Sequence, residues 1–280
     1  MRESIEFRIP EEHAARWLSD SDGVSLGGSV RKIELETHDA RMSVIAEAER
    51  ALKQHGRAFF TAWKQRRIYA DAELESAALL RLKISAVFEP SGEAGGTKYN
   101  ESVACRHCGA GAKQIGPLFL DVKRIPKGKD FAKTIAGEIV ISRRASDLFI
   151  QHGITGVAFH PVRSKGAKSL ELPDWSQLVV RSEGAEIVAP TRAGNDPFDD
   201  DPKGESRCPE GDLIGLNLLS EVFISAESRG EADVVASRQF TGVRRGSLRP
   251  QRVLFVSPKL WRLIDSEKLK GCEIEVAHLV

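Results

Sequence analysis

The chain has 280 residues, of which 41% are hydrophobic and 29% are charged, and its formal net charge is +1. This balance is typical of a globular protein and excludes a collagen-like chain or a highly charged disordered one. A net charge so close to zero also excludes a global attraction to polyanions, so any affinity for nucleic acid has to come from local patches.

The first hundred residues mix strand and helix patterns. Alternation of apolar and charged residues predicts strands, and apolar residues at helical spacing predict helices. One helix follows Pro10, and the other is preceded by Asp39, a residue suited to cap it. The expected elements are strands at 4–9, 30–35 and 82–88 and helices at 11–18 and 40–52.

Two segments rich in Gly, Pro and Asp divide the chain. The break at 91–96 and the linker at 190–204 carry the turn-forming residues that end regular structure. Asp199, Asp200 and Asp201 lack the alternating spacing of a calcium loop, so we assign them to the linker. The predicted domains are an N-terminal mixed α/β region at 1–96, a first repeat at 97–194 and a second, degenerate repeat at 204–280.

An internal repeat is predicted by aligning residues 141–162 with residues 256–277 without a gap. Ser142 then falls on Ser257, and Gly156 falls on Gly271. Each copy reads as a strand, a Ser cap, a helix, a Gly turn and a strand. The alternative is a chance match between two generic segments of this type. The expected fold class is α+β, with two related strand-helix-strand repeats after the N-terminal region.

A Cys-x-x-Cys knuckle at Cys105–Arg106–His107–Cys108–Gly109 opens the first repeat. Two thiolates at this spacing can bind one tetrahedral zinc ion, and the Gly lets the backbone turn around the sulfurs. We expect Cys208 to be the third ligand, whereas Cys272 aligns with a strand residue and should lie in the core. The fourth ligand stays open, and the alternative is a degenerate site without metal.

Targeting and membrane signals are missing from the pattern of residues. The first ten residues are charged at every second or third position, and no segment approaches the roughly 20 apolar residues of a membrane span. Four cysteines, two of them in one knuckle, suit a reducing compartment better than a disulfide scaffold. We therefore expect a cytoplasmic protein with no membrane partner.

Two basic runs are candidates for phosphate contacts, and the more common interpretation of such runs is a solvated loop or strand edge. No nucleophile elbow, phosphate loop or HExxH motif accompanies the carboxylates, so we expect no enzymatic activity. A metal-dependent enzyme with an open zinc position is a third class that the sequence leaves open. The basic residues are Arg238, Arg244, Arg245, Arg249 and Arg252 in one run and Lys123, Arg124, Lys127, Lys129, Arg143 and Arg144 in the other.

From about residue 70 onward the chain resembles the double-CXXCG motif proteins, a family of bacterial, notably myxobacterial, paralogues. The resemblance rests on the knuckle, on the segment ending in Phe159–His160–Pro161–Val162 and on the second copy that begins at Cys208. Some members are thought to be immunity proteins against toxins. The resemblance therefore implies a non-catalytic protein-binding role with a cognate toxin as partner; the alternative is a zinc-knuckle protein that binds nucleic acid.

This sequence departs from the family pattern at its second motif, where Cys208–Pro209–Glu210–Gly211 replaces Cys-x-x-Cys. The departure puts a second zinc ion in doubt and suggests one intact knuckle beside a decayed copy. The predicted metal ligands are Cys105, Cys108 and Cys208.

Overall fold

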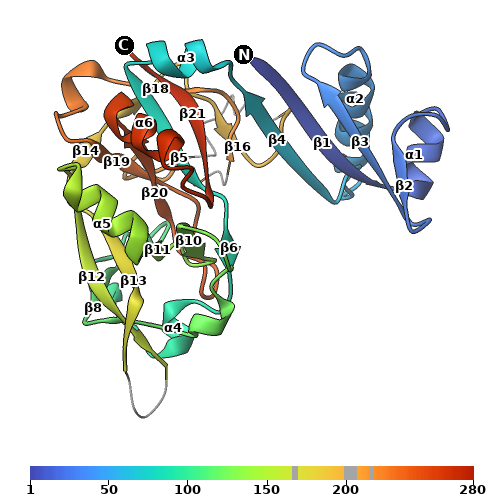
Figure 1. Cartoon of the computed structure of the whole chain (residues 1–280). Coiled ribbons are helices and arrows are strands. Elements are labelled where there is room, and N and C mark those ends of the chain that lie inside the picture. Colours follow the sequence, from blue (N-terminus) through green and yellow to red (C-terminus); the bar gives the residue numbers. More distant parts are fainter. Residues whose placement is uncertain (166–169, 199–206, 215–216) are drawn as a thin grey trace. The chain divides into compact units, whose positions relative to one another are not determined.

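The structure is a computed structural model that describes residues 1–165, 170–198, 207–214 and 217–280 (Figure 1). The linker residues Asp199, Asp200 and Asp201 lie outside the described residues. The chain divides into two compact units, Met1–Glu73 and Leu74–Val280. Both contain helices and strands, which confirms the mixed α+β class. No helix of the described part is long and apolar enough to span a membrane.

The first unit is one antiparallel sheet in the order β2-β3-β1-β4, built from a βαββαβ chain. This is the ferredoxin-like arrangement. Apolar residues on alternate positions of β1, such as Phe7, are buried, as are Ile45 of α2 and Phe59 before β4. The elements are β1 (Arg2–Pro10), α1 (Glu11–Trp17), β2 (Val24–Leu26), β3 (Val30–Glu36), α2 (Arg41–Lys53) and β4 (Ala62–Ile68), followed by α3 (Asp71–Ser76) across the boundary.

The predicted strands and helices of this unit are present within two residues of their expected ends. Asp39 is not the N-cap of α2, because Ala40 occupies that position and Asp39 Oδ1 accepts the Arg41 N–H at 2.9 Å. The unit also ends at Glu73, so the predicted boundary at residue 96 lies inside the second unit.

The second unit contains a six-stranded and a seven-stranded sheet and two two-stranded sheets. Its first half contains β5 (Leu79–Ile84), β6 (Val87–Phe88), α4 (Gly92–Gly95), β7 (Lys98–Asn100), η1 (Glu101–Val103), β8 (Lys113–Ile115), β9 (Leu118–Leu120), η2 (Val122–Arg124), β10 (Phe131–Thr134), β11 (Ile139–Ser142), α5 (Arg143–Gln151) and β12 (Val157–Ser164). Its second half contains β13 (Glu171–Val180), β14 (Glu183–Ala185), β15 (Ile187–Val188), β16 (Ala193–Gly194), β17 (Asn217–Leu218), β18 (Val222–Ile224), η3 (Ala226–Ser228), β19 (Val234–Thr241), β20 (Gln251–Val256), α6 (Pro258–Ser266) and β21 (Cys272–Leu279).

The two large sheets share one strand pattern. One contains the order β10-β11-β13-β12-β9, and the other contains β19-β20-β5-β21-β18. In each, the last pair, β12 with β9 or β21 with β18, is parallel, and the other pairs are antiparallel. The central strand of each sheet comes from the other half of the unit. β13, from the second half, completes the sheet of the first half, and β5, from the first half, completes the sheet of the second. This exchange explains why residues 74–280 form one unit instead of separate domains at 97–194 and 204–280.

The helices α5 and α6 begin in the same way. Ser142 and Ser257 are their N-caps, and each serine Oγ accepts the N–H of the third helical residue at 3.2 Å. Each serine hydroxyl also donates to an aspartate, Ser142 to Asp130 at 2.9 Å and Ser257 to Asp233 at 2.7 Å. The two serines that align in sequence therefore occupy equivalent positions at the start of a helix.

These aspartates also bind the opposite half of the unit. The second oxygen of Asp233 accepts the Thr155 N–H at 3.0 Å, and that of Asp130 accepts the Lys270 N–H at 2.9 Å. The next residues are glycines at positive φ, and a Cβ at Gly156 would collide with the carbonyl oxygen of Val234. Gly271 is equally close to the carbonyl oxygen of Phe131. Each Gly turn therefore lies directly against a strand of the other half.

We expect Asp233→Asn to destabilise the protein by about 1–3 kcal/mol, because a buried acceptor of several hydrogen bonds is altered. Burial raises the pKa of the Asp233 carboxyl, but hydrogen bonds from Ser257 and Thr155 and the charge of Lys259 outweigh it and leave that pKa below its ordinary value. The ionised form therefore stabilises the fold above the unfolded pKa of about 3.9 and loses this effect as the pH falls through the lower native pKa.

Urea unfolding at several pH values measures this effect. The difference between the wild type and Asp233→Asn should be constant near neutral pH and shrink below about pH 4. Asp265→Asn is the matched control, because the Asp265 side chain is 62% exposed and pairs with Lys268 at the surface. Equal effects of the two variants at neutral pH would contradict the prediction.

Candidate metal centre

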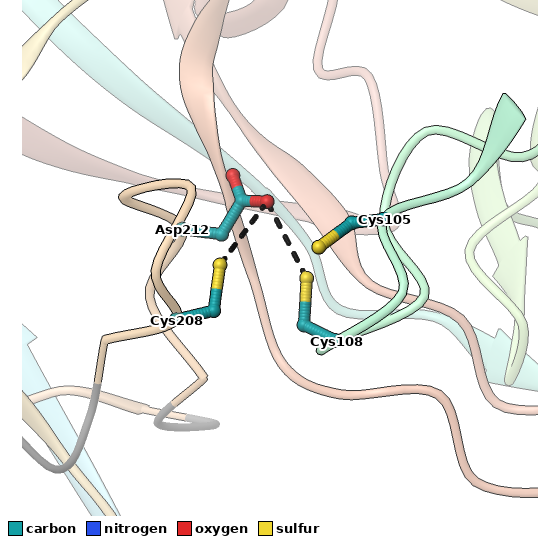
Figure 2. A group of neighbouring side chains, drawn as sticks. All are labelled: Cys105, Cys108, Cys208 and Asp212. Atoms are coloured by element: carbon teal, nitrogen blue, oxygen red, sulfur yellow. Dashed lines mark hydrogen bonds between the residues drawn. The ribbon is translucent and has the colours of Figure 1, made fainter.

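Two loops from opposite halves of the second unit meet at the cysteines. The first ligand loop, residues 101–112, joins β7 to β8 and carries Cys105 and Cys108. The second ligand loop, residues 207–214, lies between β16 and β17 and carries Cys208 and Asp212. Figure 2 shows the two loops approaching from opposite sides with these side chains turned towards one another.

The three thiols and the carboxylate form a compact donor set. One donor atom from each of the four residues lies within 4.8 Å of every other, and no second group of this kind occurs in the ranges that the structure describes. Cys108 Sγ donates to Asp212 Oδ2 at 3.4 Å, and Cys208 Sγ lies 3.9 Å from the same oxygen (Figure 2). Cys108 and Cys208 are buried, and Cys105 is half-buried. The four residues can therefore bind one metal ion.

The first ligand loop is folded around the sulfur of Cys105. The Cys105 N–H donates to Ala110 O at 2.7 Å, and the Gly109 N–H donates to Cys105 O at 2.8 Å. Gly109 has a φ of 76°, which other residues rarely adopt. Hydrogen bonds from the backbone N–H groups of Cys108 and His107 lower the pKa of the Cys105 thiol despite its partial burial. The loop therefore favours a thiolate at Cys105.

Asp212 is oriented by the backbone. Its Oδ1 accepts the Phe240 N–H at 2.8 Å, which leaves Oδ2 directed at the thiols. Within its own loop, the Cys208 N–H donates to Asp212 O and the Gly211 N–H donates to Cys208 O, each at 2.9 Å. Asp212 is therefore fixed as a donor through one carboxylate oxygen.

The chemistry of the donor set fits a thiophilic divalent cation. Burial raises the pKa of the Cys108 thiol, so this cysteine is neutral unless a cation compensates its charge. Three thiolates and a carboxylate this close together would repel one another, and a metal ion removes that repulsion. Thiolate sulfur with one carboxylate oxygen matches the ligand preferences of zinc better than those of magnesium or calcium.

The structure brings together all three predicted ligands, Cys105, Cys108 and Cys208. Cys272 lies outside the group, at the start of β21, where burial raises the pKa of its thiol to about 12. The prediction of a decayed second copy beside one intact knuckle is replaced by a single group to which both loops contribute two residues.

Asp212 is the donor that sequence reasoning missed, because the Cys-x-x-Cys spacing indicates thiolate ligands and gives no sign of a carboxylate from another loop. A signal for it exists, since aligning Cys105 with Cys208 places Gly109 opposite Asp212, one residue beyond the position of the lost cysteine. An acidic residue at that point can replace a thiolate as an anionic ligand.

No protein-family model matches the chain, and no curated protein matches it either. The resemblance to double-CXXCG proteins therefore stays a prediction that rests on the motifs.

We expect the reduced protein to bind one Co²⁺ or Zn²⁺ ion per chain. Cobalt bound by thiolates should give the intense charge-transfer and visible bands of a tetrahedral site, measured by absorbance during titration. Asp212→Asn and Cys208→Ser should weaken binding, because each removes an anionic donor, whereas Cys272→Ser should bind as the wild type does. Two ions per chain, or equal binding by Asp212→Asn, would contradict a single four-donor site.

Proposed function

We propose that this chain is a non-catalytic protein-binding protein of immunity type, which neutralises a cognate bacterial toxin and is held together by structural zinc. The observation that carries the structural part is the set of four protein donors at Cys105, Cys108, Cys208 and Asp212. The resemblance to double-CXXCG proteins supports the toxin-binding part.

A structural role for the metal is supported by the number and origin of the donors. A catalytic zinc keeps one position for water or substrate, whereas four protein ligands fill a tetrahedron. Apolar side chains surround the thiols, including Phe240, Val243 and Ile214. The two loops are about a hundred positions apart in the sequence, so a shared ion would tie one half of the unit to the other.

We further propose that residues 74–280 arose by duplication of one strand-helix-strand unit, followed by exchange of a central strand. The shared strand order of the two sheets supports this, as do the helix caps at Ser142 and Ser257 and the Gly turns at Gly156 and Gly271. Under this proposal the two ligand loops are also equivalent parts of the two copies.

The alternative, nucleic-acid binding, is weakened by ion pairs within the basic run. Four of its arginines are paired with glutamates, which leaves less positive charge for phosphates. A single-strand binder would also need a series of stacking aromatics, and the ring of Phe240 is already covered by the Arg252 guanidinium at 4.2 Å. The pairs are Arg238 with Glu186, Arg244 with Glu93, Arg249 with Glu101 and Arg252 with Glu183.

Co-expression with the products of neighbouring genes tests the toxin-binding proposal. We expect the protein to form a stable complex with one of them and to restore growth when that product is toxic. Cys208→Ser should protect less, because the two halves lose a shared ligand, and Cys272→Ser should protect fully. Failure to bind or protect against any neighbouring product would exclude this function.

Fluorescence anisotropy with labelled single-stranded and duplex DNA and RNA tests the alternative. We expect no binding at physiological salt and no steep dependence on salt concentration. Tight binding that weakens strongly with salt and is lost in Arg244→Gln/Arg245→Gln would favour the nucleic-acid role instead.

A further inference from the structure

The end of β19 and the turn after it contact both ligand loops. In this cradle segment, residues 240–249, the Phe240 N–H donates to Asp212 Oδ1 and the Arg244 N–H donates to Cys108 O, each at 2.8 Å. One short segment therefore binds a residue of each loop. It also contains three residues of the basic run for which the sequence suggested only a solvated edge or a phosphate contact.

The arginine side chains of the cradle segment extend these contacts to the chain on both sides of β7. Arg249, whose side chain is 8% exposed, donates to Glu101 at 2.7 Å and to Glu93 at 3.2 Å. Its guanidinium lies 3.6 Å from the centre of the Tyr99 ring. Arg244 donates to Glu93 at 3.2 Å and lies 3.7 Å from Glu101. Two arginines and two glutamates thus form one network.

The Tyr99 ring, on which the Arg249 guanidinium stacks, is held in place by hydrogen bonds. The Tyr99 hydroxyl donates to the buried Glu138 at 2.7 Å, and Glu138 also accepts the Gly92 N–H at 3.1 Å. Burial, together with the charge of Glu138, raises the pKa of Tyr99, so the phenol stays a neutral donor. A fixed ring limits the positions that the guanidinium can take.

The knuckle touches the same network directly. Gly109 has no Cβ, and a Cβ there would meet the side chain of Arg244. Glu101 is the first residue of η1 and of the first ligand loop, four residues before Cys105, so its position fixes where that loop begins.

We propose that Arg244 and Arg249, paired with Glu93 and Glu101, are positioning residues that hold Cys105 and Cys108 against Cys208 and Asp212. This inference rests on the proposed metal site. Groups that orient metal ligands typically change metal affinity by roughly 10–100-fold when they are removed. The planar guanidinium stacks on Tyr99 while it binds two carboxylates, which a lysine cannot reproduce.

Competition between the full-length protein and a chelator for Co²⁺ tests the proposal. Arg249→Gln should bind Co²⁺ roughly 10–100-fold more weakly than the wild type. Its visible cobalt bands should also broaden or shift, because the ligands become less well ordered. Arg249→Lys should recover only part of the affinity.

The control for general destabilisation is Arg81→Gln. Arg81 is a half-buried arginine on β5 that binds Glu275 of β21 at 2.9 Å, and neither residue belongs to a ligand loop. It should lower the stability of the apoprotein while leaving the cobalt affinity and spectrum unchanged. If Arg249→Gln does not fold, Glu101→Gln and Glu93→Gln replace it, since these side chains are 48% and 43% exposed.

The outcomes separate this inference from the metal site itself. If the wild type binds no Co²⁺, the metal site is absent and the proposal fails with it. If the wild type binds Co²⁺ and the Arg249 and glutamate variants bind within twofold of it, only the positioning role is overturned. A loss of affinity in Arg81→Gln as large as that in Arg249→Gln would also overturn it.

Discussion

The exchange of central strands between the two halves of the second unit is the constraint on which its other features depend. β5 lies between β20 and β21, although it precedes them by about 170 and 190 residues, and β13 lies between β11 and β12. A sheet that lacks its central strand leaves two rows of backbone donors and acceptors without partners. Each half therefore needs the other before its own sheet is continuous.

The remaining contacts between the halves follow from this exchange. One hydrophobic core includes Leu80 from β5, Phe131 and Phe149 from the first half, and Val256 and Leu260 from the second. The two aspartate networks then fix the registry of the halves, since each aspartate binds the serine cap of its own half and a backbone N–H of the other. Because hydrogen bonds are directional, these contacts specify one relative position of the two halves, which apolar packing alone would specify less strictly.

Sequence patterns identified local structure well and long-range pairing poorly. The predicted helix caps at Ser142 and Ser257 are correct because a cap depends only on a few neighbouring residues. The predicted boundaries differ from the division at Glu73, because alternation in residues 82–88 indicates a strand without indicating its partners. These residues form the end of β5, which pairs with β20 and β21, and the separate strand β6, which pairs with β10. The three cysteine ligands were accessible from spacing and residue type, whereas Asp212 required knowledge of which loops meet.

The aspartate in the donor set also explains why the second ligand loop depends on residues 240–249. A carboxylate can rotate and can bind through either oxygen, so a single donor position requires the other oxygen to be occupied. The Phe240 N–H occupies Oδ1 and leaves Oδ2 to the sulfurs. The same segment holds the carbonyl of Cys108, so a shift of residues 240–249 would displace a donor on each side of the centre. The cluster and this segment are therefore coupled mechanically, and the arginines within the segment contribute to the centre through position rather than through contact with an ion.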